Sequence, residues 1–171
     1  MDPFYAFIFF AALVVLENLA AQAWAAPYFR LGIPVFFSRA ALSGPLDEAQ
    51  AAQALEARFK GGPLHPSIHF KHLAPGQIAL REALFENRGG VRYLPVMHSM
   101  VRLGPQPGQA ILTGCLNWWV LAALAYTGFR SAADRSFIPV ALLVLFILGF
   151  SYILQAGVSR RIAGALAEIS A

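Results

Sequence analysis

Three apolar stretches constrain this chain more than any other feature, because each approaches the length that a helix needs to cross a lipid bilayer. We predict transmembrane helices over residues 1–29, 117–130 and 137–157. A hydrocarbon core of about 30 Å requires about 20 helical residues. The middle stretch is short, since 13 residues from Asn117 to Phe129 rise only about 20 Å. Its crossing would require extra residues at its start or a locally thinner bilayer.

The overall composition agrees with a membrane location. Of the 171 residues, 58% are hydrophobic and only 13% are charged, and the mean hydropathy is +0.57. Too few charges remain to solvate the surface of an ordinary soluble domain, a disordered tail or a nucleic-acid-binding module. We therefore expect a lipid bilayer as a partner and no nucleic acid.

Basic residues flank these stretches unevenly, which predicts an orientation. Eleven of the 13 Lys and Arg residues lie between the first two stretches or after the third, whereas Arg130 adjoins the predicted outer loop 131–136 and Arg135 lies within it. Because cytoplasmic segments near helix ends are enriched in Lys and Arg, we place the N-terminus outside. The middle domain and the tail 158–171 would then be cytoplasmic in a multi-pass protein of a bacterial-type inner membrane.

A cleaved signal peptide is the alternative for the first stretch. The small residues of Ala21–Ala25 resemble a cleavage site. However, Met1-Asp2-Pro3 lacks the basic residues that begin a signal peptide. We favour a retained helix.

Residues 30–116 are predicted to form an α+β domain of one helix and four to six antiparallel strands, inserted between the first and second transmembrane helices. Ser43 to Lys60 has acidic residues in its first turn and Gly61-Gly62 after its end, which is typical of a helix. Strands are expected over 68–73, 77–85, 91–103 and 109–115. The segment 31–37, broken by Pro34, is either an edge strand or an interfacial segment.

Polar side chains within the apolar stretches are the most unusual feature. Glu17, Asn18 and Gln22 fall within an arc of about 140° on the first helix. Placing a carboxylate inside the hydrocarbon of a bilayer costs several kcal/mol unless the group is paired, protonated or near water. We predict an intramembrane polar cluster in which these residues contact the third helix: Ser151, Tyr152 and Gln155. Hydrogen bonding within the chain, docking of another subunit and a proton or ion relay all remain possible roles.

No recognisable catalytic motif is present, and we assign no catalytic residue, cofactor or metal site. His65, His69, His72 and His98 lack a known metal-ligand spacing, and Cys115 is the only cysteine. Four arginines near the predicted helix ends are expected at the interface, where they determine topology or attract anionic lipid: Arg30, Arg39, Arg160 and Arg161.

These features predict an accessory or assembly subunit of a membrane complex, whose cytoplasmic domain binds a partner protein or lipid headgroups. Another membrane protein or a second copy of the chain is the expected partner. Two alternatives remain: a small membrane enzyme acting where the domain meets the bilayer, and a transporter or channel subunit that uses Glu17. Because the sequence contains no recognisable catalytic motif, we favour a protein that is not an enzyme.

Overall fold

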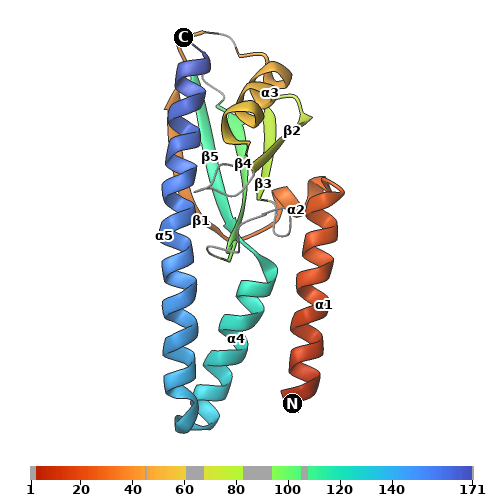
Figure 1. Ribbon diagram of the computed structural model, residues 1–171, viewed down its shortest axis with the longest axis vertical. Helices are drawn as coiled ribbons and strands as arrows, with labels where there is room; N and C mark the ends of the chain where they lie inside the picture. The colour runs from red at the N-terminus through yellow and green to blue at the C-terminus, as the bar shows by residue number, and fades with distance from the viewer. Residues whose placement is uncertain (1–2, 45, 61–67, 83–93, 105–107, 171) are drawn as a thin grey trace.

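The computed structural model describes residues 3–44, 46–60, 68–82, 94–104 and 108–170. It is an α+β structure with a five-stranded antiparallel sheet at one end and helices at the other (Figure 1). The strands are β1 (Pro34–Ala41), β2 (Ile68–Ala74), β3 (Gln77–Glu82), β4 (Met97–Leu103) and β5 (Gln109–Leu116). The helices are α1 (Pro3–Gln22), α2 (Ala26–Arg30), α3 (Glu48–Phe59), α4 (Trp118–Ala133) and α5 (Ile138–Ile169), with a 3-10 turn η1 (Arg135–Phe137) before α5.

The sheet order is β1-β5-β4-β3-β2, and every neighbouring pair is antiparallel. β2 and β3 form a hairpin through Pro75 and Gly76, as the turn sequence predicts; Gly76 adopts φ 75°, which a glycine accommodates without strain. β5 leads through Asn117 directly into α4. The end of the sheet is therefore fixed to the helical part of the molecule.

The two faces of the sheet are covered unequally. One face packs against α3 and the second half of α5, and this core contains Leu55, Ile78, Val101, Ile162 and Leu166. On the other face, α2 and the end of α1 cover a smaller area. There, Tyr28 and Phe29 pack against Ala79 and Met100.

Three helices lie together beyond the sheet: α1, α4 and the first half of α5 (Figure 1). α1 packs against α4, and α4 packs against α5. The N-terminus and the α4–α5 connection lie at the same end of the molecule, opposite the sheet and the C-terminus.

The long helix α5 changes its surroundings near its middle. Up to Leu154 its large apolar side chains are mostly exposed, including Phe146 at 71% and Ile153 at 68%. From Gln155 onward most side chains are buried, and Ile162 and Leu166 are fully so. The first half thus presents apolar groups to its surroundings, whereas the second half belongs to the core of the domain.

Among the described residues, one helical segment, Arg135–Ile169, is long and apolar enough to cross a membrane. The predicted α+β fold with an antiparallel sheet is confirmed, but three transmembrane helices are not shown. α4 has 16 residues and α1 contains a shorter apolar segment, Ile8–Gln22, so neither meets the same criterion.

The structure also differs from the predicted boundaries. Residues 158–169, expected in a tail, continue α5, because the i, i+4 series Val158, Ile162 and Leu166 packs on the sheet. The helix predicted from Ser43 begins at Glu48, since the side chain of Asp47 caps it by accepting from the amides of Ala49 and Gln50. The segment 31–37 contributes to a strand, β1, at the sheet edge. Predicted strand residues 83–85 and 91–93 lie outside the described residues.

The different burial of the two halves of α5 predicts that substitutions in them differ in their effect on the free energy of unfolding. Ile162→Ala should lower the free energy of unfolding by about 2–5 kcal/mol, because it leaves a cavity in the core. Ile153→Ala, on the same helix but exposed, should change it by less than about 1 kcal/mol. Thermal unfolding in detergent, followed by circular dichroism, provides the comparison. Equal losses in the two variants would contradict the assignment of the second half to the core.

Candidate functional site

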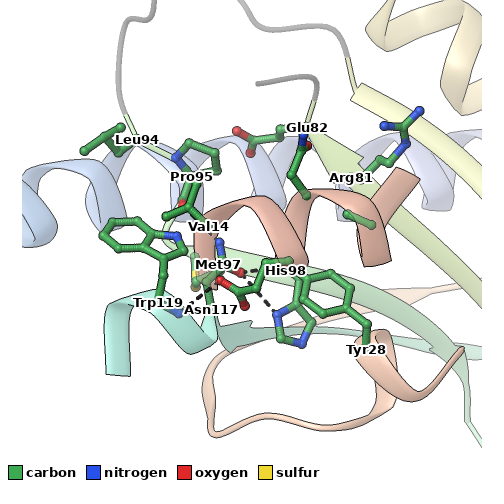
Figure 2. Close-up of a pocket in the computed structure, with 13 residues that line it drawn as sticks. Val14, Tyr28, Arg81, Glu82, Leu94, Pro95, Met97, His98, Asn117 and Trp119 are labelled. Atoms are coloured by element: carbon green, nitrogen blue, oxygen red, sulfur yellow. Dashed lines mark hydrogen bonds between the residues drawn. The ribbon is translucent and has the colours of Figure 1, made fainter. Parts of the chain in front are cut away.

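The candidate site lies where the end of α1 meets the start of α4 and the adjacent end of the sheet (Figure 2). Glu17 is only 3% exposed. Its carboxylate accepts hydrogen bonds from the backbone amides of Trp118, at 2.5 Å, and Trp119, at 3.0 Å. These amides belong to the first turn of α4, where backbone donors lack partners within the helix. Glu17 thus caps α4 from a different helix, and the positive end of the helix dipole favours its negative charge.

Asn117 occupies the N-cap position of α4, but its side chain does not cap that helix. Its amide nitrogen donates to the carbonyl oxygen of Pro95 at 2.9 Å, and its amide oxygen accepts from the Tyr28 hydroxyl at 3.3 Å. The same oxygen lies 3.2 Å from Nδ1 of His98. Asn117 therefore connects α2, β4 and the segment before β4, which leaves the capping of α4 to Glu17.

Both ring nitrogens of His98 face oxygen atoms. Nδ1 lies near Asn117, and Nε2 lies 3.1 Å from the carbonyl oxygen of Leu31. A neutral imidazole donates from only one nitrogen, so the two oxygens compete for one proton. Burial lowers the pKa of His98 below its usual 6.5, while the bonds to Asn117 and Leu31 act in the opposite direction. The net direction is downward, so the buried ring is favoured in its neutral form.

A cavity of about 270 Å³ adjoins these residues. Its polar lining combines groups from α1, β3, β4 and the start of α4: Glu17, Asn18, Arg81, Glu82, His98 and Asn117. Apolar groups line the rest, among them Leu94, Pro95 and Trp119 (Figure 2). The guanidinium of Arg81 also lies 5.2 Å from the centre of the Trp24 ring. A cavity of this mixed character suits a small amphiphilic group.

The predicted polar cluster is divided between two places. Gln155 accepts from the amides of Val96 and Met97, at 3.0 and 2.9 Å, and donates to the carbonyl oxygen of Met97 at 2.7 Å. The Tyr152 hydroxyl donates to the carbonyl oxygen of Val35 at 2.9 Å, and Ser151 is buried. The hydrogen bonds of Gln155 and Tyr152 therefore connect α5 to the sheet. The structure thus gives Glu17 and Gln155 different partners from those expected.

The other α1 residues of that prediction also diverge. Asn18 lines the cavity, whereas Gln22 is exposed at the end of α1. Within the polar arc of Glu17, Asn18 and Gln22, Glu17 does contact another part of the protein, as expected. Its partner, however, is the first turn of α4, and a free backbone amide carries no signature in the sequence that would identify it.

The four arginines expected at the interface occupy separate positions. Arg30 donates two hydrogen bonds to the side-chain oxygen of Gln77, at 3.1 and 3.0 Å. Arg39 is exposed on β1, and Arg160 is exposed on α5. Arg161 lines a second cavity with Arg58 and Glu168. Arg160 and Arg161 lie about 9 Å along the helix beyond Leu154, beside the domain.

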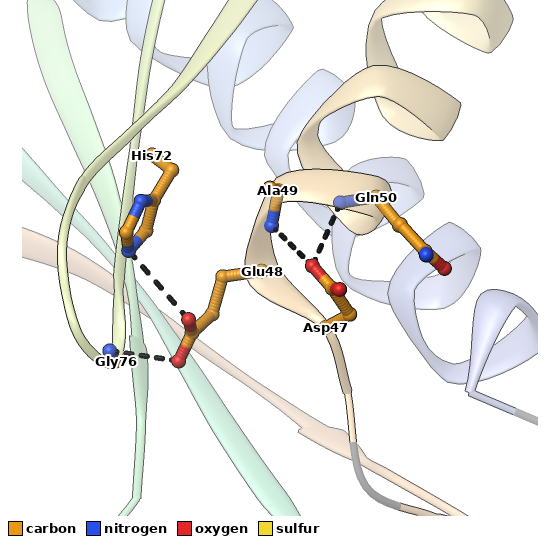
Figure 3. Close-up of polar contacts among 6 residues, drawn as sticks. All are labelled: Asp47, Glu48, Ala49, Gln50, His72 and Gly76. Atoms are coloured by element: carbon orange, nitrogen blue, oxygen red, sulfur yellow. Dashed lines mark hydrogen bonds and ion pairs between the residues drawn. The ribbon is translucent and has the colours of Figure 1, made fainter.

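Two of the histidines pair with acids of α3. Nδ1 of His69 lies 3.0 Å from Glu56, and Nε2 of His72 lies 3.5 Å from Glu48. Glu48 also accepts from the amide of Gly76 at 2.9 Å (Figure 3). These contacts join α3 to the β2–β3 hairpin. In the part of the chain that the structure describes, no group of three or more His, Cys, Asp or Glu side chains is placed to hold a metal ion.

No protein-family model matches the chain, and neither a curated protein nor a solved structure is significantly similar to it.

The cap on α4 yields a test. Glu17→Leu removes both acceptors and should lower the free energy of unfolding by about 1–3 kcal/mol, because two partly buried amides lose their partners. Glu17→Gln keeps one acceptor oxygen and should lose less. Gln22→Leu, an exposed change on the same helix, is the control. Melting temperatures in detergent should fall in the order wild type, Glu17→Gln, Glu17→Leu, while Gln22→Leu should melt close to the wild type; an unchanged melting temperature of Glu17→Leu would exclude the capping role.

The lowered pKa of His98 predicts a pH dependence. In the unfolded chain the His98 ring is protonated near pH 6.5, whereas in the folded chain its lowered pKa delays protonation to a lower pH. The contribution of His98 to stability is therefore fully present well above pH 6.5 and is lost as the pH falls below that value.

Urea unfolding of the wild type and of His98→Asn at about pH 7.5 and about pH 5 measures this effect. The variant should show a smaller loss between the two pH values. The control His72→Asn should retain the dependence that His98 causes. A His98→Asn protein as acid-sensitive as the wild type would contradict the assignment.

Proposed function

We propose that the chain is an integral membrane protein whose three helices cross the bilayer and whose α+β domain binds a partner at one membrane surface. The exposed apolar side chains on the helices carry the proposal. They lie on α1, α4 and the first half of α5: Tyr5, Ile8, Phe9, Val15, Leu16, Leu19, Phe129, Val140, Leu142, Phe146, Phe150 and Ile153. A soluble protein rarely exposes so much apolar surface in one region.

The dimensions of the three helices support a shared crossing. The 20 residues of α1 rise about 30 Å, and the 16 residues of α4 rise about 24 Å. The apolar part of α5, from Ile138 to Leu154, rises about 25 Å. These lengths approach the hydrocarbon thickness of about 30 Å, and the shorter helices need modest thinning of the bilayer.

The arrangement of the ends supports the predicted topology. The N-terminus and the α4–α5 connection share one end of the molecule, and the domain with the C-terminus occupies the other. The domain end carries most of the basic residues, which favours a cytoplasmic domain in a bacterial-type inner membrane.

An accessory or assembly subunit suits this structure better than a transporter. Both oxygens of Glu17 are used by the first turn of α4, so this carboxylate has a structural role that explains its burial. The three helices form a row α1–α4–α5 that leaves broad apolar sides for lipid or for another membrane protein. A small enzyme at the junction remains the second candidate, favoured by the cavity beside His98 and Glu17.

Reporter fusions and mild extraction test the proposal together. Green fluorescent protein fused after Ala171 should fluoresce, and alkaline phosphatase inserted at Asp134 should be active. After extraction of native membranes in a mild detergent, the chain should elute in size-exclusion chromatography as part of a larger assembly.

The outcomes separate the two parts of the proposal. Reversed reporter activities would overturn the topology. Recovery of the chain as a monodisperse single copy, both before and after cross-linking in intact membranes, would overturn the role as a subunit.

A further inference from the structure

The face of the sheet opposite α3 and α5 carries a concentration of positive charge. Strand register places Arg39, Ile111, Arg102 and Gln77 side by side across four strands. Arg30 of α2 binds the last of these. Lys71 and Arg81 lie on the same face: Lys71 pairs with Ala79, and both cations lie over Trp24 of the α1–α2 turn.

Negative charge is segregated from this face. Within the five described strands the one acidic residue is Glu82, which ends β3 beside the α1 cavity, five residues from Gln77 and so away from the row of Arg39 and Arg102. The acids of α3 and of the end of α5 belong to the opposite, covered side, where Arg58 pairs with Glu168 and His72 with Glu48. Glu56 reaches His69 at the β2 edge. The open face of the sheet is thus positive, whereas the covered side carries its acids together with basic residues such as Arg58, Lys60 and Arg161.

The part of this face formed by β1 and β5 also exposes apolar groups. Phe37 is 63% exposed beside Thr113, in the row next to Arg39 and Ile111. α2 covers the neighbouring strands β3 and β4 at Ala79 and Met100. We call the surface of Phe37, Arg39, Arg102 and Ile111 the basic sheet face. Its mixture of arginine and apolar side chains is typical of the surfaces by which proteins bind one another.

We propose that the basic sheet face docks an acidic segment of a partner protein that carries apolar side chains between its carboxylates. This inference rests on the proposed function and specifies the chemistry of the partner. Arginine binds carboxylates through paired hydrogen bonds, and the two arginines flank an apolar strip that suits an aliphatic or aromatic side chain.

A membrane surface fits this face less well. Ile111 lies five residues before the end of β5, so the row of arginines lies about 17 Å along the strand from the end of β5, which α4 follows. Electrostatic attraction to lipid headgroups declines over a Debye length of about 8 Å at physiological ionic strength. Single-stranded nucleic acid also fits poorly, since it stacks its bases on exposed aromatic side chains, and this face exposes Phe37 alone among the strand residues described.

Binding to a defined peptide tests the inference. The full chain in dodecyl maltoside is titrated into a fluorescein-labelled peptide of ten alternating Glu and Val residues, and fluorescence anisotropy gives the dissociation constant. The wild type should bind this peptide at least tenfold more tightly than its Gln–Val counterpart. The double variant Arg39→Gln, Arg102→Gln should bind about tenfold more weakly than the wild type.

A matched control removes the same amount of charge elsewhere. The double variant Arg135→Gln, Arg160→Gln changes two exposed arginines outside the face and should keep the wild-type affinity within about twofold. Melting temperatures of both variants should equal that of the wild type, because all four side chains are exposed.

Four results would overturn the inference: no binding to the Glu–Val peptide, equal affinity of the two double variants, tighter binding to vesicles of phosphatidylglycerol and phosphatidylcholine, or tighter binding to a 20-nucleotide single strand. The last two would assign the face to lipid or nucleic acid instead. The reporter fusions do not depend on this face. If they report a cytoplasmic domain but the peptide does not bind, only the identity of the partner is rejected. Reversed reporters would reject the proposed function itself.

Discussion

The change in surroundings along α5 is the constraint on which the rest of the structure depends. One continuous helix exposes most of its large apolar side chains up to Leu154 and buries most of its side chains from Gln155 onward. Gln155 marks this boundary with three hydrogen bonds to the backbone at Val96 and Met97. Such bonds are effective because they satisfy buried backbone groups at the end of a sheet. The domain is therefore held rigidly at one end of the helical layer.

A second connection reinforces the first from the opposite side. Glu17 of α1 supplies the cap that Asn117 does not, and Asn117 in turn holds Tyr28, His98 and the segment at Pro95. A membrane subunit with a domain fixed in this way presents a defined surface to its surroundings. In our proposal, that surface is the basic sheet face, which points away from α3 and the core. Orientation of this face by the helices would make docking selective for a partner in the same membrane.

Local sequence patterns predicted the elements better than the contacts between them. The apolar stretches, the α3 helix and the strands of the antiparallel sheet followed from local chemistry. The partner of Glu17 did not, because it is a backbone amide 101 residues away. The continuation of α5 was missed although Val158, Ile162 and Leu166 recur every four residues, a signal that could have revealed it. The arginine row depends on strand register, which apolar periodicity alone does not determine across four strands.

The most direct measurement is the accessibility of spin labels along α5 in lipid vesicles. Single labels at residues 142, 146, 150 and 153 should collide readily with oxygen, which concentrates in the hydrocarbon, and little with a water-soluble nickel complex. Labels at 160 and 164, on the domain-packed half, should show the reverse. We expect the change in accessibility to occur between residues 153 and 160. Strong nickel accessibility at 146 and 150 would contradict it, since the apolar half of α5 would then lie in water.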